Sequence, residues 1–355
     1  MSLLDLLGLH RFPAAARGAT LVVADSATLA HARGLLQALT ERLGPLAVAL
    51  ADAGEAPAQL PWPVLRLPAQ GVGRWHRRLA APRVIALGAC AGRPDVLEGA
   101  DACSWVNAQT NHAALAGCRL VTVADAQAAE RIPGAKLTGD PLVELTGLPA
   151  AAVDEALCER FRDQRAAGRW VGYFAATGED EEPVAYGSFF QLARRKMGLL
   201  VLAPADPARY EPVYREAIKY RLPTNRHNRL STSYVPIKTR VYYVEDAEVM
   251  AGLYGCADYV VVGGTVSEAA RNAPDVLTPL ALGRATIVGP ARHDALIGAA
   301  VRAGAVAAAT TPEEMVDHAA AWILDPAAAQ AQGERGRAWL HAQVGARERV
   351  LALLN

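Results

Sequence analysis

The sequence has no net charge, no closely paired cysteines and no long apolar run. Its 355 residues include 36 Lys and Arg against 36 Asp and Glu, so the formal net charge is zero. A dedicated nucleic-acid-binding protein usually carries a basic surface, so nucleic acid is not an expected partner. The hydrophobic share of 52% excludes a disordered chain, which is too polar to bury a core.

The cysteines show no C-x-x-C spacing and no zinc signature; they are Cys90, Cys103, Cys118, Cys158 and Cys256. This scatter favours a reducing compartment and predicts that all of them are small buried side chains. The opening run MSLLDLLGLHRF lacks the basic region of a signal peptide. It is also shorter than the ~20 apolar residues that span a bilayer. We expect a cytoplasmic protein, with peripheral contact at the inner membrane as the alternative.

Three common catalytic motifs are missing from the chain. It contains no G-x-x-x-x-G-K-[ST], no G-x-G-x-x-G at the first expected strand and no G-x-S-x-G. These motifs serve phosphate binding, dinucleotide binding and nucleophilic catalysis. Their absence disfavours ATPases, dehydrogenases and the common hydrolases.

Short apolar runs alternate with amphipathic stretches along the chain, a pattern typical of an α/β protein with parallel strands. The alternation restarts after residues 141–168, which predicts two successive Rossmann-like α/β/α domains at 1–145 and 146–340. A final helix at 341–355 is expected to pack back on the first domain. Ligands bind at the carboxyl ends of the strands in such sheets, here in a central cleft. The expected strands are 19–24, 46–51, 64–67, 84–87, 104–107, 120–123, 135–138, 170–175, 198–203, 241–244, 259–262 and 285–288. The expected helices are 26–41, 73–79, 126–131, 150–167, 184–196, 208–220, 246–255, 276–282, 294–303, 312–324 and 328–354.

The segment from Asp258 to Glu268 is an apolar strand that ends in two glycines and several polar residues. Glycine lets the backbone approach a ligand closely, and a hydroxyl can cap a helix or bind a phosphate. A carboxylate just downstream can accept hydrogen bonds from ribose. A nucleotide subsite and a capped turn with Glu268 in a capping box both fit. The donor-binding residues expected here are Gly263, Gly264, Thr265, Ser267, Glu268, Arg271 and Asn272.

A second strand runs into Thr177, Gly178 and four consecutive acids, residues 179–182, before Pro183. Acids at a helix N-terminus complement the helix dipole, so much of this run is expected to be structural. The backbone N–H groups of Thr177 and Gly178, with Glu179 beside them, are expected to meet a donor phosphate. No residue spacing here indicates a metal site.

Residues 215–240 form a basic, aromatic-flanked stretch in an otherwise neutral chain. Loops of this kind are often functional. A solvated basic surface is the alternative to an anion-binding loop. The residues expected to meet an anion are Arg226, Arg229 and Lys238.

In the first domain, Asp25 and Ser26 end the first strand and begin a helix, so they lie at the expected cleft edge. Asp25 is the candidate general base. Ser26 is expected to act as the N-cap of the helix, and it is the second candidate catalytic residue.

The order of short motifs resembles the bacterial 3-deoxy-D-manno-octulosonic acid (Kdo) transferases, which are glycosyltransferases of the two-domain GT-B architecture. The resemblance runs from about residue 83 to the end. Each motif is weak alone, and their common order carries the resemblance. The matching stretches are Val106–Ala108, Lys136–Asp140, Thr177–Glu182, Tyr243–Asp246, Tyr254–Asp258, Gly263–Gly264, Leu280–Gly283, Gly289–Pro290 and Gly345–Leu354.

The chain departs from this family at its functional motifs. The slot of the family's catalytic Glu holds Ala27 and Thr28, and the family's Pro-Arg-His-Pro becomes Pro204-Ala-Asp-Pro207. The family's nucleotide-facing Glu is replaced in the stretch Pro274–Pro279, and we expect no counterpart of the family's amino-terminal anchor. The segment from Gly264 to Glu268 instead resembles a loop of peptidoglycan glycosyltransferases of the same architecture, where a Glu holds the ribose.

The resemblance implies an inverting, metal-independent glycosyltransferase that moves a sugar, such as Kdo or a related sugar acid, from a nucleotide sugar such as CMP-Kdo. The acceptor would be a glycan or lipid-linked hydroxyl in cell-surface glycan or lipopolysaccharide synthesis. No cofactor or metal is expected. Two alternatives remain open: a sugar-nucleotide epimerase or hydrolase of the same fold, and a non-catalytic GT-B partner subunit.

Overall fold

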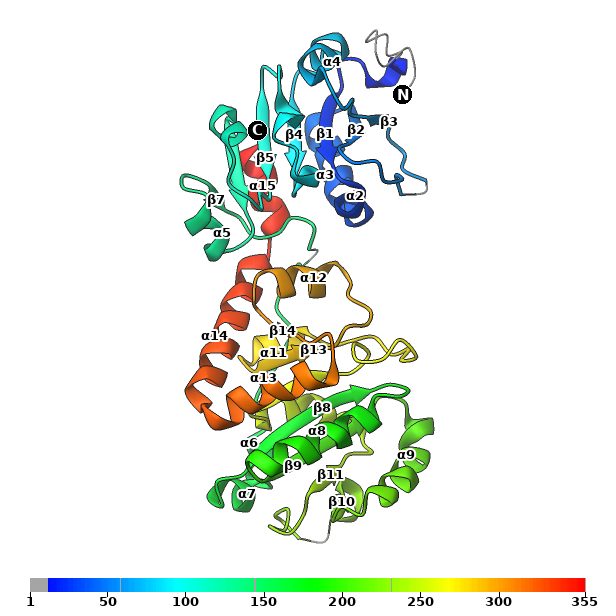
Figure 1. Ribbon diagram of the computed structural model, residues 1–355, viewed down its shortest axis with the longest axis vertical. Helices are drawn as coiled ribbons and strands as arrows, with labels where there is room; N and C mark the ends of the chain where they lie inside the picture. Colours follow the sequence, from blue (N-terminus) through cyan, green and yellow to red (C-terminus); the bar gives the residue numbers. More distant parts are fainter. Residues whose placement is uncertain (1–11, 58, 144, 231, 355) are drawn as a thin grey trace. The chain divides into compact units, whose positions relative to one another are not determined.

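The computed structural model describes residues 12–57, 59–143, 145–230 and 232–354. The chain divides into two compact units (Figure 1), which are described separately. Unit 1 consists of residues 1–147 and 342–355, and unit 2 consists of residues 148–341. The run MSLLDLLGLHRF falls almost entirely outside the described residues, so its expected character stays a prediction.

The described part of unit 1 contains one sheet of seven parallel strands in the order β3-β2-β1-β4-β5-β6-β7. The strands are β1 Thr20–Ala24, β2 Leu46–Leu50, β3 Val64–Arg66, β4 Val84–Leu87, β5 Cys103–Val106, β6 Leu120–Val123 and β7 Lys136–Leu137. The α-helices are α2 Ser26–His31, α3 Arg33–Leu43, α4 Val72–Leu79, α5 Ala126–Arg131 and α15 Ala346–Leu353. Helix α15 packs with α3, and Arg83 donates a hydrogen bond to the Leu354 carbonyl.

The apolar residues of β1 explain why this sheet is buried on both faces. Successive side chains of a strand point to opposite faces. Leu21 and Val23 belong to one core cluster, whereas Val22 and Ala24 belong to another. A strand buried on both faces reads as a continuous apolar run, which is the pattern that the sequence shows.

The described part of unit 2 contains a second parallel sheet of seven strands in the order β10-β11-β9-β8-β12-β13-β14. The strands are β8 Trp170–Thr177, β9 Gly198–Pro204, β10 Thr224–Arg226, β11 Val241–Tyr243, β12 Tyr259–Val262, β13 Ala285–Val288 and β14 Ala307–Ala308. The α-helices are α6 Glu155–Glu159, α7 Arg162–Ala166, α8 Glu182–Arg195, α9 Tyr210–Ala217, α10 Ala247–Leu253, α11 Leu277–Ala281, α12 Ala295–Arg302, α13 Pro312–Leu324 and α14 Pro326–Gln343. Two parallel Rossmann-like sheets in succession confirm the predicted α/β fold class.

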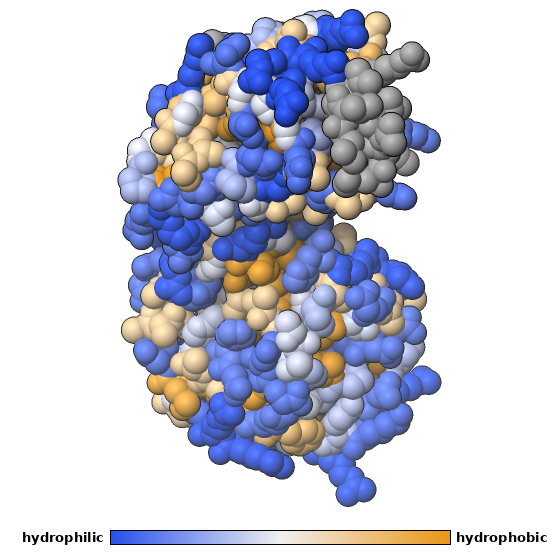
Figure 2. All heavy atoms as spheres, turned by 45° about the horizontal axis from the view of Figure 1, so that its top comes forward, coloured by the Kyte–Doolittle hydropathy of each residue, from blue (hydrophilic) through white to orange (hydrophobic). Residues whose placement is uncertain are grey.

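The core of unit 2 also lies on both faces of its sheet. Trp170 and Phe174 of β8 belong to one cluster, while Val171, Tyr173 and Ala175 belong to the other. On the face drawn in Figure 2, hydrophilic side chains cover most of the surface, and apolar ones form small groups. Within the described residues, no helix has both the length and the apolar character needed to cross a membrane.

Several expected elements differ from the structure. The expected helix 328–354 is divided at Gly345, whose φ of +70° is left-handed and ends α14 before α15 begins. The expected helix 26–41 is divided at Ala32, and 150–167 contains two short helices. Strands β10 and β14 were not expected, because neither is a run of buried apolar residues.

The prediction that all the cysteines are small buried side chains of a reducing compartment is wrong for one pair, which is oxidised, and for Cys118, which is only partly buried. Cys158 and Cys256, which are 98 residues apart in sequence, form a disulfide within unit 2. Because the two cysteines are so far apart in sequence, local cysteine spacing could not predict that they pair. Cys90, Cys103 and Cys118 are free, and Cys118 is only partly buried.

Candidate functional site

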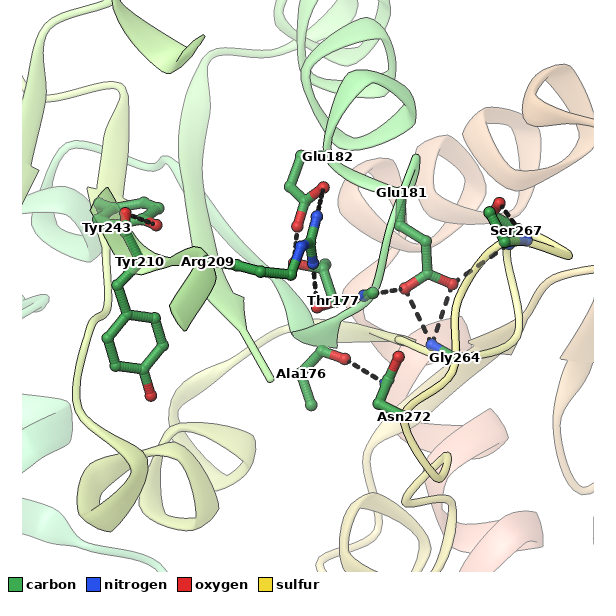
Figure 3. A network of polar contacts seen from close by, with 12 residues as sticks. Ala176, Thr177, Glu181, Glu182, Arg209, Tyr210, Tyr243, Gly264, Ser267 and Asn272 are labelled. Atoms are coloured by element: carbon green, nitrogen blue, oxygen red, sulfur yellow. Dashed lines mark hydrogen bonds and ion pairs between the residues drawn. The ribbon is translucent and has the colours of Figure 1, made fainter. Parts of the chain in front are cut away.

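The candidate site of unit 2 lies at the topological switch point of its sheet, where the strands that follow β8 in sequence lie first on one side of β8 and then on the other. β9 flanks β8 on one side and β12 flanks it on the other. Open α/β sheets bind ligands at the carboxyl ends of strands at such a switch point. The loops after β8 and β12 both begin there (Figure 3), so the structure brings together the predicted residues Gly178, Gly264 and Ser267.

Glu181 is the residue that joins these loops. Its side chain is fully buried, and one carboxylate oxygen accepts the Gly178 N–H at 2.6 Å. The Gly264 N–H donates to both oxygens, at 3.0 and 2.9 Å. The N–H groups of Val266 and Ser267 donate to Oε1 at 2.8 and 3.2 Å. One carboxylate therefore accepts hydrogen bonds from four backbone N–H groups of two loops.

This arrangement corrects the expected role of Gly178 and Gly264. The Gly178 N–H was predicted to hold a donor phosphate, and Gly264 was predicted to let the backbone approach a ligand, but the N–H groups of both already donate to Glu181. A buried N–H group needs one good acceptor, and the carboxylate supplies it. The structure thus shows an anion among these amides, and the anion belongs to the protein itself.

The glycines of the second loop permit close packing of backbone against backbone. A Cβ atom on Gly263 would lie well under 3.0 Å from the carbonyl oxygens of Ala175 and Ala176. Gly264 has a φ of +80°, and a Cβ there would lie 2.7 Å from the carbonyl oxygen of Asn272. The close approach that we predicted for a ligand is made by neighbouring strands and loops.

Thr265 and Asn272 form hydrogen bonds with neighbouring strands and loops of unit 2. The Thr265 hydroxyl donates to the Val262 carbonyl at 2.6 Å and accepts the Gly289 N–H at 2.9 Å. Asn272 donates from Nδ2 to the Ala176 carbonyl at 2.7 Å. Among the described residues, its buried Oδ1 has no hydrogen-bond partner. The expected phosphate contact of Thr265 is therefore replaced by a structural one.

The alternative that we left open for the segment after β12, a helix cap with Glu268 in a capping box, is not formed. Ser267 Oγ accepts the Ala269 N–H at 3.1 Å within a turn, and the next helix, α11, begins only at Leu277. Glu268 is exposed in this turn, so it does not belong to a capping box. Arg271 and Glu179 are exposed as well, so their predicted contacts with a donor remain predictions.

Arg209 is a functional candidate that the sequence analysis missed. It lies in the 3₁₀ turn after β9, and its guanidinium donates to the Glu182 carboxylate at 2.8 Å and to the Thr177 carbonyl at 3.1 Å. Thr177 Oγ1 donates to the other oxygen of Glu182 at 2.8 Å. The Arg209 side chain is 25% exposed. Arg209 lies two residues after Pro207, the last residue of the stretch in which the family's own arginine is replaced. This proximity could have indicated Arg209 as a substitute for that arginine.

A cavity of about 220 Å³ adjoins this network. Its lining combines several acids with one arginine and two stacked tyrosines: Glu179, Asp180, Glu182, Pro183, Tyr186, Arg209, Pro212, Val213, Glu216 and Tyr220. Pockets for whole ligands usually measure ~300–1,000 Å³. The cavity is thus too small for a complete nucleotide sugar. Arg209 is the positively charged side chain in its lining.

Arg226 is held by carboxylates of its own unit, which corrects the expectation of a free cation. Its Nε donates to both oxygens of Glu245 at 2.9 and 2.8 Å, and Nη2 pairs with Glu211 at 3.1 Å. The guanidinium also lies over the Tyr214 ring, 4.3 Å from its centroid. Hydrogen bonding to Glu245 raises the pKa of Arg226 above its usual value. The group is a structural ion pair.

The other two basic residues are exposed but lie apart. Arg229 follows β10 at the carboxyl end of the sheet, whereas Lys238 precedes β11 at the amino end. The structure therefore does not bring Arg226, Arg229 and Lys238 together as one anion site. β10 is three strands from β8 in the sheet, which corresponds to about 14 Å.

In unit 1, Asp25 occupies the switch point between β1 and β4. It is the N-cap of α2, where we expected Ser26, and it accepts the Thr28 N–H at 2.7 Å. Its other oxygen accepts the Ala91 N–H, in the loop after β4, at 3.3 Å. Asp25 is half-buried, so it stays accessible as a candidate base.

Ser26 is bound by Asp52, a second residue that the sequence analysis missed. Its hydroxyl donates to Asp52 Oδ2 at 2.6 Å, and its N–H lies 3.2 and 3.1 Å from the two carboxylate oxygens. Burial acts to raise the pKa of Asp52, but the hydrogen bonds from Ser26 outweigh it, and the pKa is lowered overall. Within the described residues, no three His, Cys, Asp or Glu side chains are grouped so as to hold a metal ion.

No model of a known protein family matches the chain. A 3-deoxy-D-manno-octulosonic acid transferase of Bordetella pertussis is 29% identical over 196 residues, which are 54% of this chain and 45% of that protein. The chain thus matches less than half the length of this relative. The similarity confirms the resemblance to Kdo transferases that the motif order predicts.

Solved structures that resemble the chain share little sequence with it. The C-terminal CMP-Kdo binding domain of WaaA from Acinetobacter baumannii is 20% identical, with a TM-score of 0.47 over 52% of this chain and 96% of that one. MurG from Acinetobacter baumannii is 14% identical, with a TM-score of 0.45 over 95% of this chain and 99% of that one.

Proposed function

We propose that the protein is a glycosyltransferase that transfers a sugar, Kdo or a related sugar acid, from a nucleotide sugar to an acceptor hydroxyl. The observation that carries the proposal is the similarity to the Bordetella pertussis Kdo transferase. Two successive parallel sheets, each with polar loops at its switch point, support it. The reaction is inverting and metal-independent in this proposal, and it serves cell-surface glycan or lipopolysaccharide synthesis.

Arg209 is the side chain that we assign to the donor. It lies at the carboxyl end of β9, beside the switch point, and is partly exposed while Glu182 and the Thr177 carbonyl fix its orientation. A guanidinium fixed in this way binds a phosphate or carboxylate through two parallel hydrogen bonds. Arg209 would stabilise the charge that develops on the leaving phosphate.

Asp25 is the group that we assign to the acceptor. In an inverting transfer, a base removes the proton of the acceptor hydroxyl while that oxygen attacks the anomeric carbon, and the nucleotide leaves with the bonding electrons. The backbone N–H groups of Thr28 and Ala91 fix the orientation of the carboxylate. A positioned general base contributes typically ~10²–10⁴-fold to the rate.

A thermal-shift screen with CMP-, UDP-, GDP- and dTDP-linked sugars tests the proposal. A ligand at ~100 times its Kd stabilises a protein by about 2.7 kcal/mol, a shift of several degrees. Arg209→Lys keeps the charge that balances Glu182 but loses the planar fork, so we expect at least tenfold weaker binding. Arg215→Lys, on the exposed face of α9, is the matched control and should bind as the wild type does. If none of the sugars shifts the unfolding temperature, the proposal fails.

A non-catalytic relative is the second candidate, because Glu181 already occupies the amides expected to bind a phosphate. Such a protein would release no nucleotide with any acceptor. An epimerase or hydrolase of the same fold would instead convert the bound nucleotide sugar without an acceptor. Nucleotide release with and without added acceptor therefore distinguishes a transferase, a hydrolase and a protein that releases none, and chromatography of the sugar nucleotide then separates an epimerase from a non-catalytic protein.

A further inference from the structure

The amide cluster of unit 2 has the form of an anion-binding site. Four N–H groups, from Gly178, Gly264, Val266 and Ser267, converge on one point at the switch point of the sheet. Converging backbone N–H groups make concave sites that bind phosphates and other anions. Here the Glu181 carboxylate fills the centre of the cluster (Figure 3).

Glu181 is bound too fully for this to be an incidental surface contact. Its side chain has 0% exposure, and each carboxylate oxygen accepts at least two hydrogen bonds. A buried carboxylate is costly unless hydrogen bonds compensate for lost water. The preceding acids of the run, Glu179 and Asp180, are exposed and take no part in the cluster.

The donors come from distant parts of the chain. Gly178 lies three residues before Glu181, whereas Gly264, Val266 and Ser267 lie 83 to 86 residues after it. Without an acceptor at this point, four buried or half-buried N–H groups would be unsatisfied at once. The carboxylate therefore satisfies, at one point, the donors of two loops that are distant in sequence, beside the Asn272 and Gly263 bonds to β8.

We propose that Glu181 is a built-in anion: its carboxylate takes the place of a ligand phosphate among these amides and holds the two loops together. Glu181 is thus a positioning residue, and phosphate is excluded from the cluster while the carboxylate is in place. A donor must then present its phosphate to side chains such as Arg209. Only this last consequence rests on the proposed function.

The first test is anion rescue of Glu181→Ala, with Glu179→Ala as the matched control. Loss of the carboxylate should lower the unfolding temperature by on the order of 10 °C, because charge-assisted hydrogen bonds are lost. Formate or inorganic phosphate at millimolar concentration should restore at least half of this loss and reach saturation. Sodium chloride at equal ionic strength should not. The proposal is overturned if formate and phosphate stabilise Glu181→Ala no more than Glu179→Ala.

The second test uses the wild-type protein and decides the matter if Glu181→Ala does not fold. Inorganic pyrophosphate is titrated while the amide ¹H–¹⁵N resonances of Gly178 and Gly264 are followed. We expect both resonances to stay in place, since Glu181 occupies their N–H groups. A saturable shift of both would overturn the proposal. Neither test contains a nucleotide sugar, so failure of the proposed function would leave both results unchanged.

Discussion

Replacement of Gly263 by alanine tests the closest backbone contact of the candidate site. The Gly263 N–H donates to the Ala175 carbonyl at 2.8 Å, which aligns the end of β12 with β8. An added Cβ would lie well under 3.0 Å from the carbonyl oxygens of Ala175 and Ala176, a separation that real Cβ atoms essentially never show. Because both obstacles are backbone, no side-chain rotation relieves the clash, and the loop itself must move.

The expected cost follows from what that movement breaks. Overpacking in a dense region costs typically 1–3 kcal/mol. Displacing the loop also weakens the hydrogen bonds from Gly263 to Ala175 and from Gly264 to Glu181, at roughly 1 kcal/mol each. The free energy of unfolding of unit 2 should therefore fall by about 4 kcal/mol. For a unit of this size, that lowers the unfolding temperature by about 12 °C.

Gly187→Ala is the matched control for this prediction. Gly187 lies on the exposed face of α8, and a Cβ there would meet nothing within 4 Å. Alanine in a helix interior is favoured over glycine by roughly 0.5–1 kcal/mol, so this variant should be slightly more stable than the wild type. Both variants are compared by calorimetry and urea unfolding. If Gly263→Ala stays within 1 kcal/mol of the wild type, the close contact of β8 and β12 is refuted.

Three further predictions concern the disulfide, pH and the candidate base. Replacing Cys158 and Cys256 together by serine should lower the free energy of unfolding by about 4 kcal/mol under oxidising conditions, because the disulfide closes a long loop. A reductant should destabilise the wild type but leave the variant unchanged. The pKa of Asp52 is lower in the folded protein than its unfolded-state value of ~3.9, because Ser26 donates hydrogen bonds to the ionised carboxylate. These bonds therefore stabilise the fold fully above pH ~3.9, and their contribution is lost as the pH falls through the folded-state pKa. The stability difference between wild type and Asp52→Asn, from urea unfolding at pH 7 and below pH 4, should therefore shrink in acid. Asp25→Asn keeps the helix cap on Thr28, since Asn and Asp cap equally well, but its amide nitrogen cannot accept the Ala91 N–H. The free energy of unfolding should therefore fall by only about 1 kcal/mol, while transfer slows ~10²–10⁴-fold; unchanged turnover would refute the base assignment.

The fold was largely predictable because buried parallel strands are runs of apolar residues. The strand at residues 259–262 and its neighbour at 285–288 have the bounds that we expected. β10 was missed because its three residues are half-buried and polar, so only its pairing with β11 makes it a strand. A pairing of this kind depends on the three-dimensional fold and has no local pattern.

The site was less predictable, because its hydrogen bonds join residues far apart in sequence. The sequence pointed to the loops that contain Gly263, Gly264 and the acids after Gly178, but the roles that we expected of these residues as donor contacts stay predictions. Their partners could not be inferred: the carboxylate of Glu181 meets N–H groups 83 to 86 residues away. Arg226 illustrates the same limit, because Glu245, 19 residues downstream, makes it a structural ion pair.

In each unit, one carboxylate joins the two loops at the switch point of the sheet. At a switch point, the loops after two neighbouring strands diverge, and their N–H groups need an acceptor. In unit 1 the carboxylate of Asp25 bridges the loops after β1 and β4, and in unit 2 that of Glu181 bridges the loops after β8 and β12. Asp25 takes two N–H groups and stays half-buried, whereas Glu181 takes four and is fully buried. The acid of unit 1 thus stays accessible, as the proposed base must be, whereas the acid of unit 2 is enclosed by its loops. This difference in burial is why we assign proton transfer to Asp25 and positioning to Glu181.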